Sequence, residues 1–501
     1  MLLSMQLLLM YKTTMFLYQT PALYTFDKMV VELDGLSEVE LMQRAGTRVW
    51  QVIKARWGSH LDTITIFVGC GNNGGDGFVV ALQASVAGLA VQLISHGDLV
   101  GQSITAARYR QQWLQAGGSI EIWQHQAIKG QVIVDGLLGI GLSRSLDDGY
   151  ISLINTINQN IALTVAIDIP SGLNADTGMP QPVAVIAEVT ITFFAHKTGQ
   201  YLADGPDICG DIIVDELGVS AGTLSKALLA LTVLDEKNSR LPAKRLRNSH
   251  KGLFGHILVI GGDKGMSRAA LLAAQTSLRA GAGVVSVLVH PDCIHQLSTT
   301  PELMVKSWRE IDSCLDSATV IVVGPGIGQE ATSCLKKLTG LSIPIVVDAS
   351  ALTARFLDSL SSSQIVITPH PGEAAKLLAM STSEVQRDRL VVSQQLVDRF
   401  GVVSVLKGSG SLIQQAGSMP VINVRGHPGM ATAGMGDIQA GLIAAFIGQG
   451  LPLFDAAKAG VFIHSLCAED YLDDNDEISL IATDIIDRLP KVIKQLRQHS
   501  S

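Results

Sequence analysis

The chain has 501 residues, which is too long for one ordinary hydrophobic core, so two or three domains are expected. Its 49 glycines, 47% hydrophobic content and 16% charged content are typical of globular α/β enzymes and argue against a disordered chain. The 37 basic and 45 acidic residues give a net charge of −8 without a long Lys/Arg run, which disfavours nucleic acid and anionic membranes as partners.

The first ten residues are apolar, but they lack the basic start and the cleavage site of a signal peptide. We interpret residues 1–15 as a non-native or dispensable extension, because Met5, Met10 and Met15 could each be the first residue. No apolar run of about 20 residues follows, so no membrane span is predicted. The six cysteines are scattered and form no Cys-x-x-Cys pair, which disfavours zinc and disulfides and fits a cytoplasmic protein.

Short β-branched runs recur along the chain and end in Gly or Asp before helix-like stretches. Examples are Thr63–Val68, Val132–Val134, Thr164–Ile167, Ile257–Ile260, Val320–Val323, Ile343–Val347, Ile365–Ile367 and Val402–Leu406. Apolar strands that alternate with helices indicate parallel sheets covered on both faces, with ligands at the carboxyl ends of the strands. The pattern is interrupted between residues 220 and 249, by helix-like and then polar, basic sequence that neither sheet needs. We interpret it as a linker and place the domain boundary near residue 228.

The first strand leads into Gly69-Cys70-Gly71-Asn72-Asn73-Gly74-Gly75-Asp76-Gly77, with an apolar helix expected from Phe78. The spaced glycines satisfy Gly-x-Gly-x-x-Gly, so a dinucleotide fold of the dehydrogenase type is an alternative. The two asparagines and the aspartate are unusual for a turn that only clears space for a pyrophosphate. They offer polar side chains to a ligand.

Two further strand ends in this half carry acids. Asp135 follows one strand, with a second flexible glycine loop behind it, and Asp168 and Ser171 follow the next. Each acid alone could be a turn or helix cap. Three acids at the strand ends of one parallel sheet favour a shared cleft instead.

These N-terminal motifs, NNGGDG, VDGLLGIGL and AIDIPSGLNADTG, resemble the epimerase domain of the NAD(P)H-hydrate repair enzymes. The resemblance implies that the hydrated dinucleotide contacts Asn72, Asn73, Gly74, Gly75, Asp76, Gly139, Ile140, Gly141, Leu142, Ser143, Arg144, Ser145 and Asp168. It also implies that Asn73, Asp135 and Ser171 bind potassium. Inversion at C6 of the hydrated nicotinamide needs loss and return of hydroxide, or ring opening, and a carboxyl group helps either route. Asp76 and Asp168 are both candidates for that group.

The C-terminal half ends its series of motifs with Gly434-Met435-Gly436-Asp437 at the start of an apolar helix. Backbone N–H groups in such a nest, at the positive end of a helix, bind an anion such as phosphate. An acid there is explained if it removes a proton from a hydroxyl that attacks the phosphate. The alternative is that Asp437 only caps the helix.

This half also contains Gly261-Gly262-Asp263, Val323-Gly324-Pro325-Gly326, Val347-Asp348-Ala349-Ser350, Thr368-Pro369-His370 and Lys407-Gly408-Ser409-Gly410-Ser411. The set resembles the ADP-dependent NAD(P)H-hydrate dehydratases, which have a ribokinase-like fold. By that resemblance Lys407, Gly408, Ser409, Gly410, Ser411 and Gly436 bind the nucleotide, and Ala269, Gly328, His370 and Asp437 face the hydrated dinucleotide. Asp437 would deprotonate the C6 hydroxyl as it receives a phosphoryl group, and the ring nitrogen would then expel phosphate.

The two resemblances predict an α/β chain with a Rossmann-like epimerase domain in residues 1–228 and a ribokinase-like dehydratase domain in residues 229–501. We expect epimerisation of R and S NADHX and NADPHX, followed by dehydration of the S form. Potassium would serve the first domain, and Mg²⁺ with ADP or ATP the second. A homo-oligomer is expected, because such domains commonly assemble.

Several residues depart from the family pattern: Ile140, Arg268, Ser350, His427 and Ala433. We expect little effect from Ile140, because backbone N–H groups make most of the contact in its loop, whereas the other four bear on substrate affinity or turnover. Three other functions stay open. A ribokinase-type kinase for a vitamin or sugar would leave the N-terminal motifs unexplained, and a dehydrogenase would leave the C-terminal half unexplained. The third is an N-terminal domain that only binds a dinucleotide.

Overall fold

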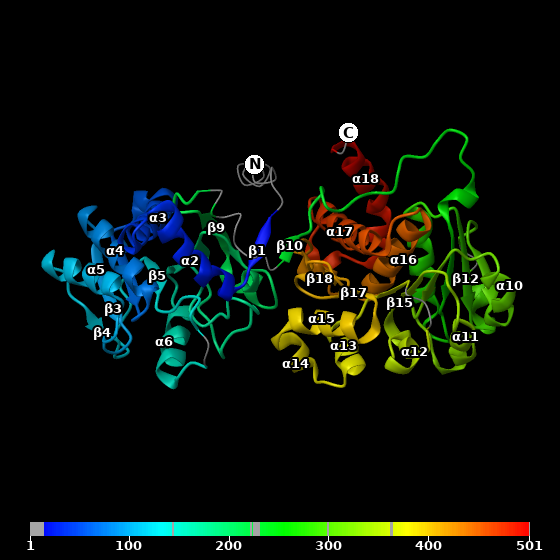
Figure 1. Cartoon of the computed structure of the whole chain (residues 1–501), viewed down its shortest axis with the longest axis horizontal. Helices are drawn as coiled ribbons and strands as arrows, with labels where there is room; N and C mark the ends of the chain where they lie inside the picture. Colours follow the sequence, from blue (N-terminus) through cyan, green and yellow to red (C-terminus); the bar gives the residue numbers. More distant parts are fainter. Residues whose placement is uncertain are drawn as a thin grey trace. The chain divides into compact units, whose positions relative to one another are not determined.

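The computed structural model describes residues 15–142, 145–220, 223, 231–297, 300–360 and 364–499. The chain divides into two compact units, Phe16–Leu231 and Thr232–Ser501, and each is described by itself (Figure 1). The predicted boundary near residue 228 lies among residues 224–230, outside the described parts. Within those parts, no helix combines the length and apolarity that crossing a bilayer requires.

The N-terminal unit is built on a sheet of seven parallel strands in the order β4-β3-β2-β5-β6-β7-β9. The strands are β2 (Thr63–Val68), β3 (Ala90–Ser95), β4 (Glu121–Ile122), β5 (Val132–Gly136), β6 (Leu163–Ile167), β7 (Val189–Phe193) and β9 (Asp211–Asp215). A short parallel pair, β1 (Phe16–Tyr18) and β8 (His196–Lys197), lies outside this sheet. The order changes direction at β2 and β5, so loops after these strands border the crevice in which such sheets bind ligands.

Helices cover both faces of this sheet, as the apolar strands predict. Alternate residues of β2 pack on different helices: Ile64 and Ile66 share a core with α3, α4 and α5, and Phe67 shares one with α6. The helices are α2 (Thr20–Asp34), α3 (Glu38–Trp57), α4 (Asn72–Val86), α5 (Ile104–Gln115), α6 (Asp148–Asn158) and α7 (Gly205–Cys209). Figure 1 shows α3, α4 and α5 in blue beside the strands of this sheet.

The prediction that the helix after β2 starts at Phe78 is wrong, because α4 starts at Asn72. The polar residues of the glycine-rich segment therefore form the first turn of the helix, where free backbone N–H groups face a ligand. Glycine is required at positions 69 and 74, because the backbone packs closely where the helix begins. A Cβ at Gly74 would lie 2.0 Å from the carbonyl oxygen of Gly69, and one at Gly69 would lie 1.9 Å from that of Leu137.

The C-terminal unit contains a larger sheet, in the order β13-β12-β11-β14-β15-β16-β17-β18-β19-β10. Neighbouring strands from β13 to β17 in this order are parallel, and β18 is antiparallel to both of its neighbours, β17 and β19. Their bounds are β11 (His256–Ile260), β12 (Val284–Val289), β13 (Met304–Ser307), β14 (Val320–Val323), β15 (Ile345–Val347), β16 (Ile365–Ile367), β17 (Val403–Leu406), β18 (Ser411–Gln414) and β19 (Val421–Asn423).

One expectation about the linker is wrong. Within it, Leu231–Val233 forms β10, which pairs in parallel with β19. Leu231 and Val233 are buried, so this short apolar segment gains both hydrogen bonds and burial by joining the sheet. Only the following polar residues, 234–250, run as irregular chain.

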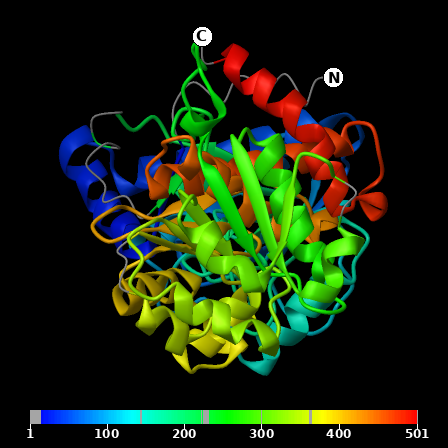
Figure 2. The same cartoon turned by 90° about the vertical axis from the view of Figure 1, so that its right-hand side faces the viewer.

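Four long helices share a core with alternate residues of the larger sheet; the first three lie on one face of the sheet, and the last packs on those helices. They are α9 (Ser267–Arg279), α16 (Met435–Gly448), α17 (Leu453–Leu472) and α18 (Ala482–His499). The others are α10 (Ile311–Leu315), α11 (Thr332–Lys337), α12 (Ala354–Ser359), α13 (Pro371–Leu378), α14 (Thr382–Arg387) and α15 (Arg389–Phe400). Figures 1 and 2 show the yellow helices α13–α15 on the side of the strands away from α18.

Candidate active sites

The N-terminal unit contains a cavity of about 790 Å³ at the carboxyl ends of its strands. Its wall combines residues from α2, α3, the first turn of α4, the loop after β5, and the ends of β6 and β7. The lining includes Tyr24, Glu32, Glu38, Met42, Cys70, Asn72, Asn73, Asp76, Leu138, Gly139, Ile140, Gly141, Leu142, Tyr150, Asp168, Phe193, Phe194 and Lys197. Strand-end loops and a helix N-terminus thus surround one space large enough for a nucleotide-sized ligand.

Most of the predicted dinucleotide-binding residues line this cavity. Gly74 and Gly75 do not line it, because they are buried inside the first turn of α4 against Gly69 and Met42. Ser145 is described but does not line it either, and residues 143–144 lie outside the described parts of the chain.

The structure brings together the three predicted potassium ligands. Asn73 donates from Nδ2 to the carbonyl oxygens of Leu138 (2.9 Å) and Ile167 (2.7 Å). Leu138 in turn donates its backbone N–H to Ser171 Oγ (2.9 Å). Ser171 Oγ donates to Asp135 Oδ1 (2.6 Å). One hydrogen-bonded chain therefore joins all three residues beneath the loop after β5.

Asp135 is fully buried and accepts hydrogen bonds only from neutral groups of the described chain. These donors are the N–H and hydroxyl of Ser171 and the N–H of Leu137. Burial raises the pKa of Asp135 to about 6, although hydrogen bonds from Ser171 and Leu137 oppose the rise. A buried carboxylate without a cationic partner fits a bound cation.

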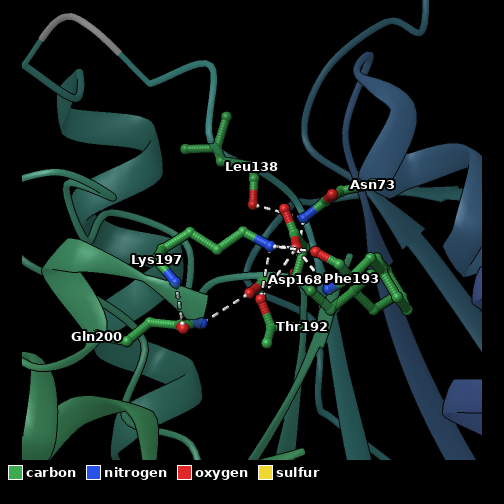
Figure 3. A network of polar contacts seen from close by, with 8 residues as sticks. Asn73, Leu138, Asp168, Thr192, Phe193, Lys197 and Gln200 are labelled. Carbon is green, nitrogen blue, oxygen red and sulfur yellow. Dashed lines mark hydrogen bonds and ion pairs between the residues drawn. The ribbon is translucent and has the colours of Figure 1, made fainter. Parts of the chain in front are cut away.

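Asp168 lies at the end of β6 and forms a buried ion pair that the sequence motifs did not indicate (Figure 3). Lys197 Nζ lies 2.5 Å from Asp168 Oδ1, and it also donates to Thr192 Oγ1 (2.7 Å) and to the carbonyl of Phe193 (2.8 Å). The lysine side chain is 2% exposed. The signal that could have revealed it is the polar His196-Lys197-Thr198 sequence, which begins three residues after the end of strand β7.

In the C-terminal unit, Asp437 occupies the first turn of α16, after Gly434 with a φ of 91°. Burial and the negative charge of Asp348, opposed by Lys407, together raise the pKa of Asp437 to about 7. A carboxyl group that titrates near neutral pH can act as a general base. Helix capping alone would not need this environment.

Lys407 follows β17 and approaches two acids, Asp348 at the end of β15 and Glu373 in the first turn of α13. Its Nζ lies 2.9 Å from Asp348 Oδ1 and 3.9 Å from Glu373 Oε2. Thr368 also donates to Asp348 Oδ1 (2.7 Å). Burial lowers the pKa of Lys407, but the charges of Asp348, Glu373 and Asp437 outweigh this and raise it. The lysine is therefore a charged group beside the N-terminus of α16.

Arg389, a residue that the sequence motifs did not indicate, supports the Lys407–Ser411 loop from below. It donates to the carbonyl oxygens of Leu406 (3.2 Å), Lys407 (3.2 Å) and Ser409. Gly408 has a φ of 145°, and a Cβ there would lie 2.9 Å from Arg389 Nη2. Burial lowers the pKa of Arg389 to about 10. The arginine therefore fixes the shape of this loop.

Ala269 lies in the first turn of α9, which runs beside α16 in the same direction. A Cβ at Gly434 would lie 2.7 Å from Leu272 Cδ1, and Ser277 donates to the carbonyl of Gly441 (3.0 Å). The N-termini of the two helices are therefore at the same end of the pair.

Gly328 follows β14 and packs against the loop that precedes α9. A Cβ at Gly328 would lie 1.9 Å from Asp263 Oδ2, and Asp263 donates its N–H to Gly326 (2.8 Å). Two of the residues predicted to face the hydrated dinucleotide, Ala269 at the start of α9 and Gly328 after β14, thus come from neighbouring segments.

His370 is exposed and caps α13: Nδ1 accepts from the N–H of Gly372 (3.0 Å). Its Nε2 lies 3.5 Å from Glu373, which is the residue that also approaches Lys407.

Among the departures from the family pattern, Arg268 and Ser350 are exposed, and His427 caps a short 3₁₀ helix beside Glu477. In the described parts of the chain no three His, Cys, Asp or Glu side chains are grouped to hold a metal.

Comparison with known proteins accounts for both units. Residues 38–199 match the family described as YjeF-related protein N-terminus, and residues 257–491 match NAD(P)H-hydrate dehydratase. The bifunctional NAD(P)H-hydrate repair enzyme of Coxiella burnetii is 40% identical over 487 residues, which cover 94% of this chain and 98% of that one. The chain belongs to the bifunctional NAD(P)H-hydrate repair enzyme family. The Escherichia coli enzyme of the same name is 36% identical over 476 residues, or 93% of this chain and 92% of that one.

A solved relative supports the fold of the C-terminal unit of this family member. The ADP/ATP-dependent NAD(P)H-hydrate dehydratase of Bacillus subtilis, co-crystallised with ATP and Mg²⁺, is 26% identical with a TM-score of 0.50. The match covers 53% of this chain and 98% of that one. The predicted fold class, two α/β domains of which the second is ribokinase-like, is confirmed.

Proposed function

We propose that the chain repairs hydrated NADH and NADPH in two steps, with one step in each unit. The observation that carries the proposal is that bifunctional repair enzymes match more than nine-tenths of the chain, across both sites. The N-terminal unit interconverts the R and S hydrates. The C-terminal unit dehydrates the S form at the expense of ADP or ATP.

In the epimerase unit, the hydrated nicotinamide binds in the 790 Å³ cavity. The first turn of α4 presents backbone N–H groups to the pyrophosphate, and residues 139–142 of the loop after β5 line the cavity around the ligand. Asp76 and Asp168 both line the cavity and are the carboxyl groups available for proton transfer at C6.

Potassium fits the cluster of Asn73, Asp135 and Ser171. A large, weakly hydrated cation favours several oxygen ligands, and this cluster offers carboxylate, hydroxyl and amide oxygens. The raised pKa of Asp135, caused by burial, gives the cation a role, since a bound positive charge favours the ionised carboxylate. The ion would supply charge compensation and order to the loop after β5.

In the dehydratase unit, Asp437 removes the proton from the C6 hydroxyl as that oxygen attacks the terminal phosphoryl group. Its pKa of about 7 suits this role at physiological pH. Lys407 and the N–H groups of the Lys407–Ser411 loop and of Gly436 stabilise the phosphates. The dinucleotide contacts Ala269, Gly328 and His370, and the phosphate formed at C6 leaves with the electrons of the broken C–O bond.

Magnesium is compatible with this site. Asp348 uses Oδ1 for Lys407 and Thr368, and a Cβ at Gly436 would lie 3.5 Å from its Oδ2, so this oxygen lies beside the start of α16. Mg²⁺ is commonly held by one or two carboxylates and the phosphates of the substrate. Bound there through Asp348, it would neutralise charge on the transferring group.

Recovery of NADH absorbance from a mixture of R and S NADHX tests the whole proposal. The purified full-length chain is supplied with Mg²⁺ and K⁺, and reactions contain ADP, ATP or no nucleotide. We expect complete recovery that depends on nucleotide. Recovery that stops near the S fraction would refute the epimerase step, and no recovery in any reaction would refute the dehydratase step.

A further inference from the structure

The two carboxylate oxygens of Asp168 have different surroundings (Figure 3). Oδ1 accepts three hydrogen bonds: from Lys197 Nζ (2.5 Å), Thr192 Oγ1 (3.2 Å) and the N–H of Phe193 (3.2 Å). Among the described residues, none donates a hydrogen bond to Oδ2, although Asp168 lines the cavity. One oxygen is therefore held by the protein, and the other is available to a ligand.

The ammonium group of Lys197 is fully used inside the protein. Its three N–H groups are directed at Asp168, at the Thr192 hydroxyl and at the Phe193 carbonyl. A lysine ammonium has three donors and no acceptor, so this group has no lone pair with which to attack a carbonyl carbon. Covalent catalysis by Lys197 is therefore inconsistent with its contacts, and a role in holding Asp168 remains.

The backbone of Asp168 is also held in an unusual conformation. Its φ of 66° lies in the left-handed region, which is strained for a residue other than glycine. The conformation is fixed from both sides, because Asp168 donates its N–H to Ile191 (2.7 Å) and accepts at its carbonyl from Gln200 Nε2 (3.2 Å). Such strain persists where the surrounding structure aims a side chain for function.

We propose that Asp168 is the catalytic carboxylate of the epimerase, acting through Oδ2, and that Lys197 is the positioning residue that holds Oδ1. This inference rests on the proposed function. Asp168 Oδ2 takes the proton of the C6 hydroxyl. The electron pair of that O–H bond forms a C6=O double bond as the C6–N1 bond breaks, and its electrons go to N1.

Oδ2 then gives the same proton to N1, so the ring-opened aldehyde has the composition of the hydrate and no co-reactant is needed. Rotation about C5–C6 presents the other face of the carbonyl. Attack by N1 returns the proton through Oδ2 to the oxygen and gives the other epimer. One accessible oxygen is sufficient, because the hydroxyl oxygen and N1 are bonded to the same carbon.

The test uses the full-length chain and measures conversion of (R)- to (S)-NADHX by chromatography without nucleotide. The variants are Asp168→Asn, Lys197→Met and their double mutant, with Lys129→Met as a matched control, since Lys129 is exposed on the same unit. We expect each active-site variant to lower kcat at least about 100-fold with KM changed only a few-fold. Dehydration of (S)-NADHX with ADP or ATP, measured in the same preparations, should be unchanged.

The double mutant decides whether Lys197 acts through Asp168. We expect it to be no slower than Asp168→Asn alone, because residues that work as a unit are not additive. Multiplied losses, or a Lys197→Met enzyme with normal kcat, would overturn the proposal. If Lys197→Met lacks the melting transition of the N-terminal unit, Thr192→Val decides instead. This substitution removes one hydrogen bond from Asp168 and one from Lys197. An unchanged kcat in Thr192→Val would also overturn the proposal.

Isotopic oxygen tests the ring-opening step separately. In H₂¹⁸O, a single turnover should leave the C6 oxygen unlabelled, whereas loss and return of hydroxide would label it. Label in the product would overturn this step. A wild-type enzyme that does not interconvert the epimers would refute the epimerase function itself, an outcome seen before any variant is compared.

Discussion

Replacement of Asp348 by Asn should move the pH dependence of the dehydratase to lower pH. The pKa of Asp437 is raised from 3.8 to about 7 by burial first and by the charge of Asp348 second. At an effective dielectric constant of about 20, a unit charge is worth roughly 4 kcal/mol at 4 Å and roughly 1.5 kcal/mol, or about one pH unit, at about 11 Å, and the smaller value sets the minimum shift that we expect. Asn keeps an oxygen for Lys407 and Thr368 but removes the charge, so we expect an apparent pKa near 6 (about one unit lower).

The sign of the effect follows from the need for an ionised base. At pH 6 the ionised fraction of Asp437 should rise from about one-tenth to about one-half, so relative activity at that pH should rise about five-fold. The assay is kcat/KM for (S)-NADHX between pH 5.5 and 8.5, corrected for the non-enzymatic rate. Each profile is scaled to its own plateau, so that any loss of nucleotide affinity does not obscure the shift.

Glu373→Gln is the matched control, because Glu373 raises the pKa of Lys407 but is not among the groups that shift the pKa of Asp437. We expect its profile to resemble that of the wild type. An acid limb that stays near pH 7 in Asp348→Asn would refute the coupling between the two acids. An equal shift in Glu373→Gln would show that the acid limb of the pH profile depends on the total charge of the site and not on Asp348 in particular.

Three further predictions concern single sites. Asp437→Asn should lower NADH formation from (S)-NADHX at least about 100-fold and leave R/S interconversion unchanged, which the two assays above measure in one preparation. Potassium should raise the melting temperature of the N-terminal unit in the wild type but not in Asp135→Asn. Burial raises the pKa of Asp135 to about 6, so the carboxylate is ionised above that pH and its charge destabilises the unit. Bound potassium offsets this cost. The stabilisation by potassium should therefore shrink below pH 6, where Asp135 is protonated. Arg389→Met should raise the KM for ADP or ATP about ten-fold or more while the KM for (S)-NADHX changes little, because Arg389 holds only the Lys407–Ser411 loop. Equal changes in both constants would contradict that role.

The sequence predicts the architecture well because parallel strands buried on both faces read as continuous apolar runs. Every strand that it predicts is present, with bounds within two residues of the observed ones. It fails at Leu231–Val233, where three apolar residues become a strand only because β19 offers an edge. It also fails at the start of α4, because polar and glycine residues read locally as a turn. Close packing of Gly74 on Gly69 makes them helical.

The amino-acid sequence is sufficient to predict the two-unit α/β organisation and the residues at the strand ends, including Asp135, Asp168 and Asp437. These depend on local signals, namely apolar periodicity and the glycines and acids that follow each strand. The side-chain pairs that form at these strand ends are visible only in the folded chain. Lys197 reaches Asp168 across 29 residues, and Lys407 reaches Asp348 across 59. Such partners are set by the order of strands in a sheet, and the burial that raises the pKa of Asp437 exists only once the helices have packed over it.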